Sequence, residues 1–220
     1  MGTADALNTA NDFAATARRL RKRLAGALPG HAAQARLAPD ARATPPGAAS
    51  VEGRTDCREA GVLAVLYPAP EDGRSMLVFT ERRDHLDDHA GQVSFPGGRR
   101  EAGESLRQTA LREAREEIAL APEVVTVLGA LTPLYIPPSN YCVHPFVAAA
   151  APAPSLTPAD AEVAAILRVP LADLLAPDAL TRETWTLHGH ATEVPFYEGA
   201  GTPPIWGATS MMLAELLALF

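Results

Sequence analysis

Apolar residues recur along the chain with two different periods, and the period changes from segment to segment. Residues 11–26 place apolar side chains at helical spacing, which predicts a short amphipathic helix that Pro29 and Gly30 stop. Apolar runs over 61–68 and 75–80 predict two neighbouring strands joined by a turn. Residues 38–56 are rich in proline, alanine and glycine, so we expect a surface connection there.

The strongest helical pattern covers about Ser105 to Leu120, and Pro122 is predicted to end this helix. A glycine-rich loop over 91–103 precedes it. Apolar residues recur in the helix every three or four positions, so one face is predicted to dock on a sheet. That face carries Ala110, Leu111, Ala114 and Ile118.

The second half of the chain alternates between short strand patterns and proline-rich stretches. Strands are predicted over 124–131, 143–150, 185–187 and 193–197, a loop over 151–159, a partly helical segment over 161–175, and a closing helix over 208–220. Met211 and Met212 of the closing helix are expected to make core or dimer contacts. This order of elements predicts an α/β (α+β) fold with a mixed β-sheet flanked by helices. We expect an N-terminal helix and connecting segment over 1–56 and the main domain over 57–220.

Composition narrows the classes of function. With 47% hydrophobic and 20% charged residues, the 220-residue chain can bury a sizeable core. No apolar run reaches the roughly 18 residues of a membrane span, and no signal region is evident, so we expect a cytoplasmic protein. The net charge of −7 disfavours broad nucleic-acid binding. Cys57 and Cys142 lie far apart in no metal-ligand spacing, which favours two free thiols over a disulfide.

Three glutamates of the 105–120 helix are the first candidates for chemistry. Glu113, Glu116 and Glu117 are related by three- and four-residue spacing, so their carboxylates converge and repel one another. Arg112 stands four residues before Glu116 and offsets only part of this charge. A hard divalent cation with oxygen ligands would offset the rest. A solvated acidic face is the alternative, and the segment in front of the helix decides between the two.

That segment carries a resemblance. Gly98, five residues, Glu104, seven residues, and then Arg112-Glu113 and Glu116-Glu117 together resemble the box of the Nudix hydrolases. Ala119 stands where that family has glycine. The resemblance implies a Nudix-type α/β/α sandwich that hydrolyses a diphosphate with Mg²⁺ or Mn²⁺. It implies Glu113, Glu116, Glu117 and the Gly98 carbonyl as metal ligands.

The resemblance also implies a division of roles within the site. Glu104 and Arg112 match the pair that braces the loop against the helix, and Arg112 belongs with the glutamates to the catalytic constellation. The general base stays open between Glu113, Glu117 and a carboxylate outside the helix. Glu162 is a candidate for the last of these, and capping or salt bridging of its own segment is the alternative for it.

A second motif bears on the substrate. Thr80-x-Arg82 and Gly91-x-x-x-Phe95-Pro96-Gly97-Gly98 resemble the motif that precedes the box in bacterial coenzyme A diphosphatases, with Asp87 standing where an arginine is usual. Segments 28–39, 131–146 and 205–213 resemble the same subgroup. This implies hydrolysis of coenzyme A or acyl-coenzyme A to 3′,5′-ADP and a 4′-phosphopantetheine. Arg82, Gly97, Gly98 and Arg99 are the expected substrate contacts, because arginine can fork onto phosphate oxygens.

Several alternatives stay open at this point. Another nucleoside diphosphate derivative, such as NADH or ADP-ribose, is a second enzymatic hypothesis, and a non-catalytic nucleotide-binding module is a third. Tyr135, Tyr141 and Trp206 can stack on a base, although packing of the core or a lid is favoured for them. The expected partner is a small nucleotide diphosphate, with neither nucleic acid nor membrane, and a homodimer through a terminal helix is compatible with the sequence.

Overall fold

A computed structural model describes residues 3–39, 49–83, 91–159, 162–187, 189–199 and 201–220. In this part of the chain, eight strands form one sheet: β1 (Arg58–Pro68), β2 (Ser75–Arg82), β3 (Val93–Ser94), β4 (Gly97–Arg99), β5 (Val125–Ala130), β6 (Leu134–Ile136), β7 (Tyr141–Ala150) and β8 (Val163–Pro170). A second sheet consists of β9 (Leu180–Leu187), β10 (His190–Tyr197) and β11 (Ile205–Trp206).

The helices are α1 (Thr3–Ala10), α2 (Phe13–Leu24), α3 (His31–Gln34), α4 (Leu106–Ile118), α5 (Leu171–Leu174) and α6 (Gly207–Leu217). Short 3-10 turns cover Ala35–Leu37, Pro122–Val124 and Pro137–Ser139. The helices predicted over 11–26, 105–120 and 208–220 are confirmed, whereas α1 was not predicted. None of the helices in the described ranges is long and apolar enough to cross a membrane.

The larger sheet is mixed, as predicted. Its strand order is β3-β2-β1-β7-β5, with β8 on β2, β4 on β1 and β6 on β7. Strands β1 and β7 run parallel, and the other pairs are antiparallel. Strand β4, which carries Gly97 and Gly98, therefore attaches to the central strand β1.

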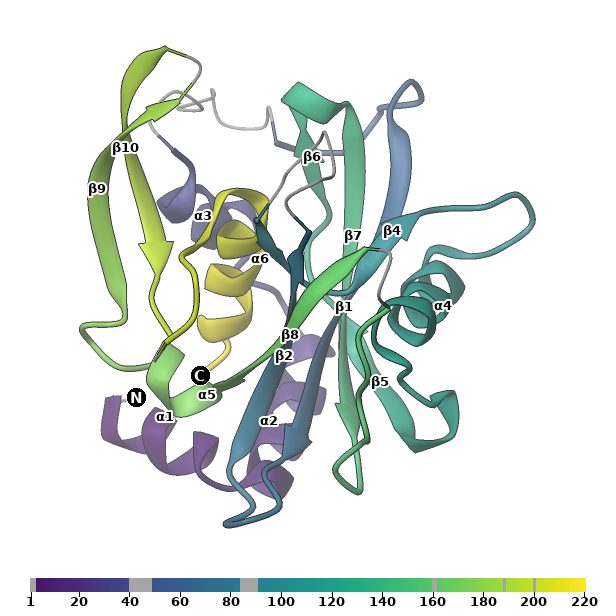
Figure 1. Ribbon diagram of the computed structural model, residues 1–220, viewed down its shortest axis with the longest axis vertical. Helices are drawn as coiled ribbons and strands as arrows, with labels where there is room; N and C mark the ends of the chain where they lie inside the picture. Colours follow the sequence, from purple (N-terminus) through teal and green to yellow (C-terminus); the bar gives the residue numbers. More distant parts are fainter. Residues whose placement is uncertain (1–2, 40–48, 84–90, 160–161, 188, 200) are drawn as a thin grey trace.

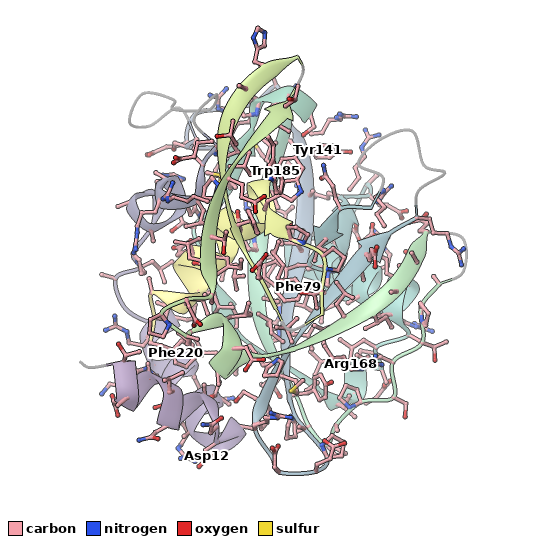
Figure 2. All side chains as sticks on the ribbon, turned by 60° about the vertical axis from the view of Figure 1, so that its left-hand side comes forward. Asp12, Phe79, Tyr141, Arg168, Trp185 and Phe220 are labelled. Carbon is pink, nitrogen blue, oxygen red and sulfur yellow. A yellow bond between two sulfur atoms is a disulfide. The ribbon has the colours of Figure 1, made fainter. Side chains whose placement is uncertain are left out.

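Helices cover both faces of this sheet (Figure 1). Helix α4 lies on one face, and α6 lies on the other, between the large sheet and the β9–β10 hairpin. Strand β1 is buried on both sides, because Leu63 and Val65 join the apolar cluster that contains the buried face of α4, while Ala64 and Leu66 join the cluster that contains α6. Phe79 of β2 lies near the centre of the molecule and is fully buried (Figure 2).

The two ends of the described chain meet at one end of the molecule. Helices α1 and α2 pack there beside the C-terminal residue Phe220 (Figure 2). Arg19 Nε donates to the carbonyl oxygen of Leu219 at 3.1 Å, and the Arg19 guanidinium also hydrogen-bonds the main-chain oxygen of Phe220. Met211 and Met212 are both buried in the same core as Leu20 of α2, so the methionines serve the core of this chain.

The partly helical segment predicted over 161–175 is wrong for most of its length. Residues 163–170 form β8, and only Leu171–Leu174 is helical. The reason is tertiary, because β8 pairs antiparallel along β2, with Val169 opposite Leu77 and Leu167 opposite Phe79. Pairing on this edge satisfies the backbone hydrogen bonds of β2 and overrides local helical propensity.

The prediction of two free thiols is also wrong. Cys57 and Cys142 form a disulfide, with Cα atoms 5.7 Å apart across a sequence separation of 85 residues. Strands β1 and β7 are parallel neighbours, and Glu59 is the register partner of Cys142. This pairing brings the residue before β1 next to the start of β7, a proximity that linear spacing does not reveal.

Candidate active site

Helix α4 carries the acidic face, and different devices fix its two ends. At the start, Ser105 Oγ accepts the Gln108 N–H at 3.4 Å, and Gln108 Oε1 accepts the Ser105 N–H at 2.8 Å. At the other end, Ala119 adopts a left-handed conformation with φ 54°. The helix therefore ends before Pro122, the predicted breaker. A left-handed alanine costs about 1 kcal/mol or more, which is why glycine suits this position.

The apolar face of α4 docks on the sheet as predicted. Ala110, Ala114 and Ile118 are fully buried in the cluster that includes Leu63 of β1. The helix approaches β1 closely at Gly61, where an added Cβ would lie 2.4 Å from the carbonyl oxygen of Leu106. Docking of this face sets the rotation of α4 and thereby turns the neighbouring acidic face toward the edge of the sheet at β4.

The glycines of β4 lie directly against the acidic face. The Gly97 N–H donates to Glu117 Oε2 at 3.2 Å. An added Cβ at Gly98 would lie 2.5 Å from the carboxyl carbon of Glu113. Because these positions lack side chains, two carboxylates of α4 reach the main chain of β4.

Arg112 organises the other acidic groups around itself. Its Nη2 and Nε donate to the two carboxylate oxygens of Glu104 at 2.9 and 3.2 Å. Its Nη1 donates to Glu113 Oε1 and Glu116 Oε2, both at 2.9 Å. A further bond, from Nη2 to the Arg99 carbonyl at 3.1 Å, ties the loop to the helix. The hydrogen bonds from Arg112 hold the pKa of the Glu104 carboxyl at about 2, and they place this pair where the motif implies a brace.

Two of the three glutamates are in an environment that disfavours a bare negative charge. Burial raises the pKa of Glu117 to about 8, and the Gly97 N–H and Arg82 counteract this only in part. Burial also raises the pKa of Glu113. The charge of Glu162 contributes to the rise at both residues.

The donor set suits a hard divalent cation, because it consists of carboxylate oxygens whose mutual repulsion and burial call for positive charge. Within the described ranges, no group of three or more His, Cys, Asp or Glu side chains is arranged to hold a metal ion as it stands. Glu113 and Glu116 both accept from Arg112 instead, and Glu116 is exposed. The carboxylate oxygens are thus the type of ligand that a hard divalent cation prefers, but two of them accept hydrogen bonds from Arg112.

A cavity of about 270 Å³ adjoins the same glycines. It lies against α6 and the strands β1 and β7, and its lining is largely apolar and aromatic. The lining residues are Ala60, Val62, Arg82, Gln92, Val93, Ser94, Phe95, Gly97, Gly98, Arg99, Ile136, Ser139, Tyr141, Val143, Trp206, Gly207, Ala208, Thr209 and Met212. Gly97 and Gly98 thus stand between the acidic face and the cavity, and a ligand that crosses them can contact both.

The structure brings all four expected substrate contacts to this cavity, because Arg82, Gly97, Gly98 and Arg99 line it. Of the three aromatic candidates, Tyr141 and Trp206 line it as well. Tyr135 does not line it, and the centroid of its ring lies 3.6 Å from the guanidinium carbon of Arg54.

Two further residues differ in their relation to the cavity. Arg100 pairs with Glu59 at 2.6 Å and does not line the cavity. Met212 was predicted to make core or dimer contacts, and it is both 4% exposed and part of the cavity wall. Its dual role follows from the packing of α6 against the sheet, for which the sequence holds no signal. Asp87 lies outside the described residues.

A family model and two sequence relatives identify one family. The sequence model of the NUDIX domain matches residues 58–188. The chain is 38% identical over 172 residues to the "Uncharacterized Nudix hydrolase NudL" of Yersinia pestis strain Pestoides F, covering 72% of this chain and 78% of that protein. The same values hold for the protein of that name from Yersinia pseudotuberculosis serotype O:1b. The solved Nudix hydrolase RenU of M. smegmatis is 24% identical, with a TM-score of 0.41 over 51% of this chain and 70% of RenU.

Proposed function

The chain belongs to the Nudix family and is a pyrophosphohydrolase, and from this premise we propose that its substrate is coenzyme A or an acyl-coenzyme A. The products would be 3′,5′-ADP and 4′-phosphopantetheine or its acyl derivative. One observation carries the proposal: the cavity begins directly behind Gly97 and Gly98, on whose other side lie Glu113 and Glu117. A diphosphate over the glycine pair would leave one end of the molecule in the cavity.

The lining of the cavity supports a substrate with a large, partly apolar end. Phe95, Ile136 and Met212 offer apolar surface, and Tyr141 and Trp206 offer aromatic rings. At about 270 Å³ the cavity is below the usual size of a pocket for a drug-sized ligand, so in this proposal it takes only one end of coenzyme A. Arg82 and Arg99 stand at the same cavity and are the cations proposed to bind the phosphate groups.

We assign Mg²⁺ or Mn²⁺ to Glu113, Glu116, Glu117 and the Gly98 carbonyl. A divalent cation bound there supplies positive charge to the phosphate oxygens and makes water more acidic. Glu113 and Glu116 accept from Arg112, so a bound cation would compete with these two hydrogen bonds. The two bonds from Arg112 to Glu104 do not involve these glutamates and would hold Arg112 in place.

The proton acceptor is one of three carboxylates in this proposal. Glu113 and Glu117 adjoin the glycine pair, and the charge of the exposed Glu162 raises the pKa of both.

The cytoplasmic location and the division of the chain at residue 57 remain predictions. A homodimer would have to use a surface other than that of Met211 and Met212, which are covered within the chain.

A substrate panel tests the proposal. Purified protein is incubated with coenzyme A, acetyl-coenzyme A, NADH and ADP-ribose, each with Mg²⁺ and with Mn²⁺, and products are separated by chromatography. Release of 3′,5′-ADP at a kcat/KM well above that for NADH and ADP-ribose is expected. Equal or faster turnover of NADH or ADP-ribose would sink coenzyme A as the substrate and leave the family assignment intact.

A further inference from the structure

A buried carboxylate outside the acidic face joins three parts of the chain. Glu215 of α6 is fully buried. Its Oε1 accepts the Gly30 N–H at 3.1 Å and the Thr132 hydroxyl at 2.6 Å. Its Oε2 accepts Gln34 Nε2 at 2.8 Å and the Thr132 N–H at 3.1 Å. Both oxygens act as acceptors, so the carboxylate links α6 to Gly30, Gln34 and Thr132.

The same face of α6 also forms a wall of the cavity. Ala208, Met212 and Glu215 are spaced by four and three residues, so they share one side of the helix. Met212 lines the cavity about one turn before the carboxylate, and Ala208 lines it about two turns before. Any rotation or slide of α6 that changes the contacts of Glu215 must therefore move that wall.

Thr132, one partner of Glu215, leads to a second part of the cavity wall. Thr132 lies just before β6, whose last residue, Ile136, lines the cavity. Tyr141, at the start of β7, continues the same wall, and β6 pairs with β7. The hydrogen bonds between Thr132 and Glu215 thus connect α6 to the segment that leads into this part of the wall.

We propose that Glu215 is a positioning residue for substrate binding: it locks α6 to Gly30, Gln34 and Thr132, and thereby fixes the shape of the cavity. The inference rests on the proposed function, in that the cavity takes one end of the substrate. Glu215 lines neither the cavity nor the glycine pair, so it acts through α6 and β6. Its loss should weaken substrate binding and leave the chemistry at the acidic face largely intact.

A purely structural role is the competing explanation, and the chain offers a matched control for it. Thr16 of α2 is fully buried, and its hydroxyl donates to the Thr9 carbonyl at 2.9 Å and accepts from the Ser75 hydroxyl at 2.8 Å. It does not line the cavity. Thr16→Val and Thr132→Val remove the same group from two buried networks, and only the second network joins the cavity walls.

The kinetic test uses Glu215→Gln, Thr132→Val and Thr16→Val, with whichever diphosphate of the panel the wild type hydrolyses best. Glu215→Gln keeps the shape of the side chain. It replaces one accepting oxygen with an amide NH₂ group, which faces the donors of Gly30, Gln34 or Thr132. KM should rise about tenfold or more in Glu215→Gln and Thr132→Val, with kcat changed less than about threefold. Thr16→Val should lower the melting temperature and leave KM unchanged. An unchanged KM in Glu215→Gln, or an equal rise in Thr16→Val, would overturn the proposal.

A second readout needs no substrate. The sequence has two tryptophans, Trp185 and Trp206, and Trp206 lies in the cavity wall directly before α6. In a Trp185→Phe background, fluorescence therefore reports Trp206 alone. Adding Glu215→Gln should shift the Trp206 emission to longer wavelength, because displacement of α6 exposes the ring, whereas adding Thr16→Val should not. An unchanged emission in Glu215→Gln would contradict the positioning role even if no diphosphate of the panel proved to be a substrate.

Discussion

The guanidinium of Arg112 donates two hydrogen bonds to the carboxylate of Glu104, from Nη2 to Oε1 at 2.9 Å and from Nε to Oε2 at 3.2 Å. The same guanidinium reaches Glu113 and Glu116 through Nη1. One arginine thus joins the loop before α4 to the acidic face on α4. The bidentate pair fixes the orientation of Arg112, and this orientation decides which carboxylates remain for a cation.

The Glu104 brace should depend on pH in a defined direction. Because the pKa of Glu104 falls from 4.5 to about 2 on folding, its contribution is fully present above pH 4.5 and is lost as the pH falls through about 2. Glu104→Gln should therefore be less stable than the wild type at pH 7, with the gap closing toward pH 2. Urea denaturation at several pH values measures the difference in the free energy of unfolding between the variant and the wild type. Glu101→Gln, at an exposed position of the same loop, is the control, and a gap that is constant down to pH 2 would refute the role.

Ala119→Gly should stabilise the protein. Ala119 holds a left-handed backbone with φ 54°, and glycine removes the steric cost, so the free energy of unfolding should rise by about 1 kcal/mol. Ala121→Gly is the matched control, because Ala121 has an ordinary φ of −69° and is also exposed. The control should lose about 0.5–1 kcal/mol, since glycine adds only freedom to the unfolded chain. Thermal denaturation of both variants shows whether stability rises in Ala119→Gly and falls in Ala121→Gly.

Gly98→Ala should impair activity more than stability. The added Cβ would lie 2.5 Å from the carboxyl carbon of Glu113, so this side chain must turn away, and we expect kcat/KM to fall by about 100-fold. Gly26→Ala, where the nearest atom is 3.6 Å away, should leave kcat/KM unchanged. Gly61→Ala should instead lower the melting temperature, because its Cβ would meet the main chain of α4 at 2.4 Å. Wild-type activity in Gly98→Ala would show that Glu113 does not need its place at β4.

Glu117→Gln should lose activity by orders of magnitude, because an anionic group is removed from the proposed ligand set. Its buried position, at 8% exposure, makes the neutral amide tolerable for folding, so the melting temperature should change little or rise. Glu123→Gln, on the 3-10 turn after α4, is the control with the same change of charge. Full activity of Glu117→Gln on every diphosphate of the panel would refute the metal assignment.

Reduction of the Cys57–Cys142 disulfide should destabilise the protein. The bond closes a long loop, and a cross-link of this kind contributes about 2–4 kcal/mol, largely through the unfolded chain. A thiol reductant should lower the melting temperature of the wild type and expose two titratable thiols. The double variant Cys57→Ala, Cys142→Ala should have the lower melting temperature at the outset and should not respond to reductant. Two titratable thiols in the untreated native protein would contradict the bond.

Helix α4 is the element whose structure the local sequence pattern predicted best. Its length, its docking face and the spacing of its glutamates are properties of consecutive residues, and the 98–120 pattern sufficed for the family and its chemistry. Segment 161–175 shows the opposite case. Residues 163–170 form β8 because they pair along β2, which is distant in the sequence.

The sequence by itself determined the acidic helix, the glycine pair before it and the pyrophosphohydrolase family, because these depend on residues close together in the chain. The tertiary structure alone decided what faces Gly97 and Gly98 from the other side. Arg82, Tyr141 and Trp206 come from distant segments, and Glu215 joins three more. Contacts of this kind arise only when α6 packs on the sheet, since hydrophobic burial brings together residues whose separation along the chain holds no record of it.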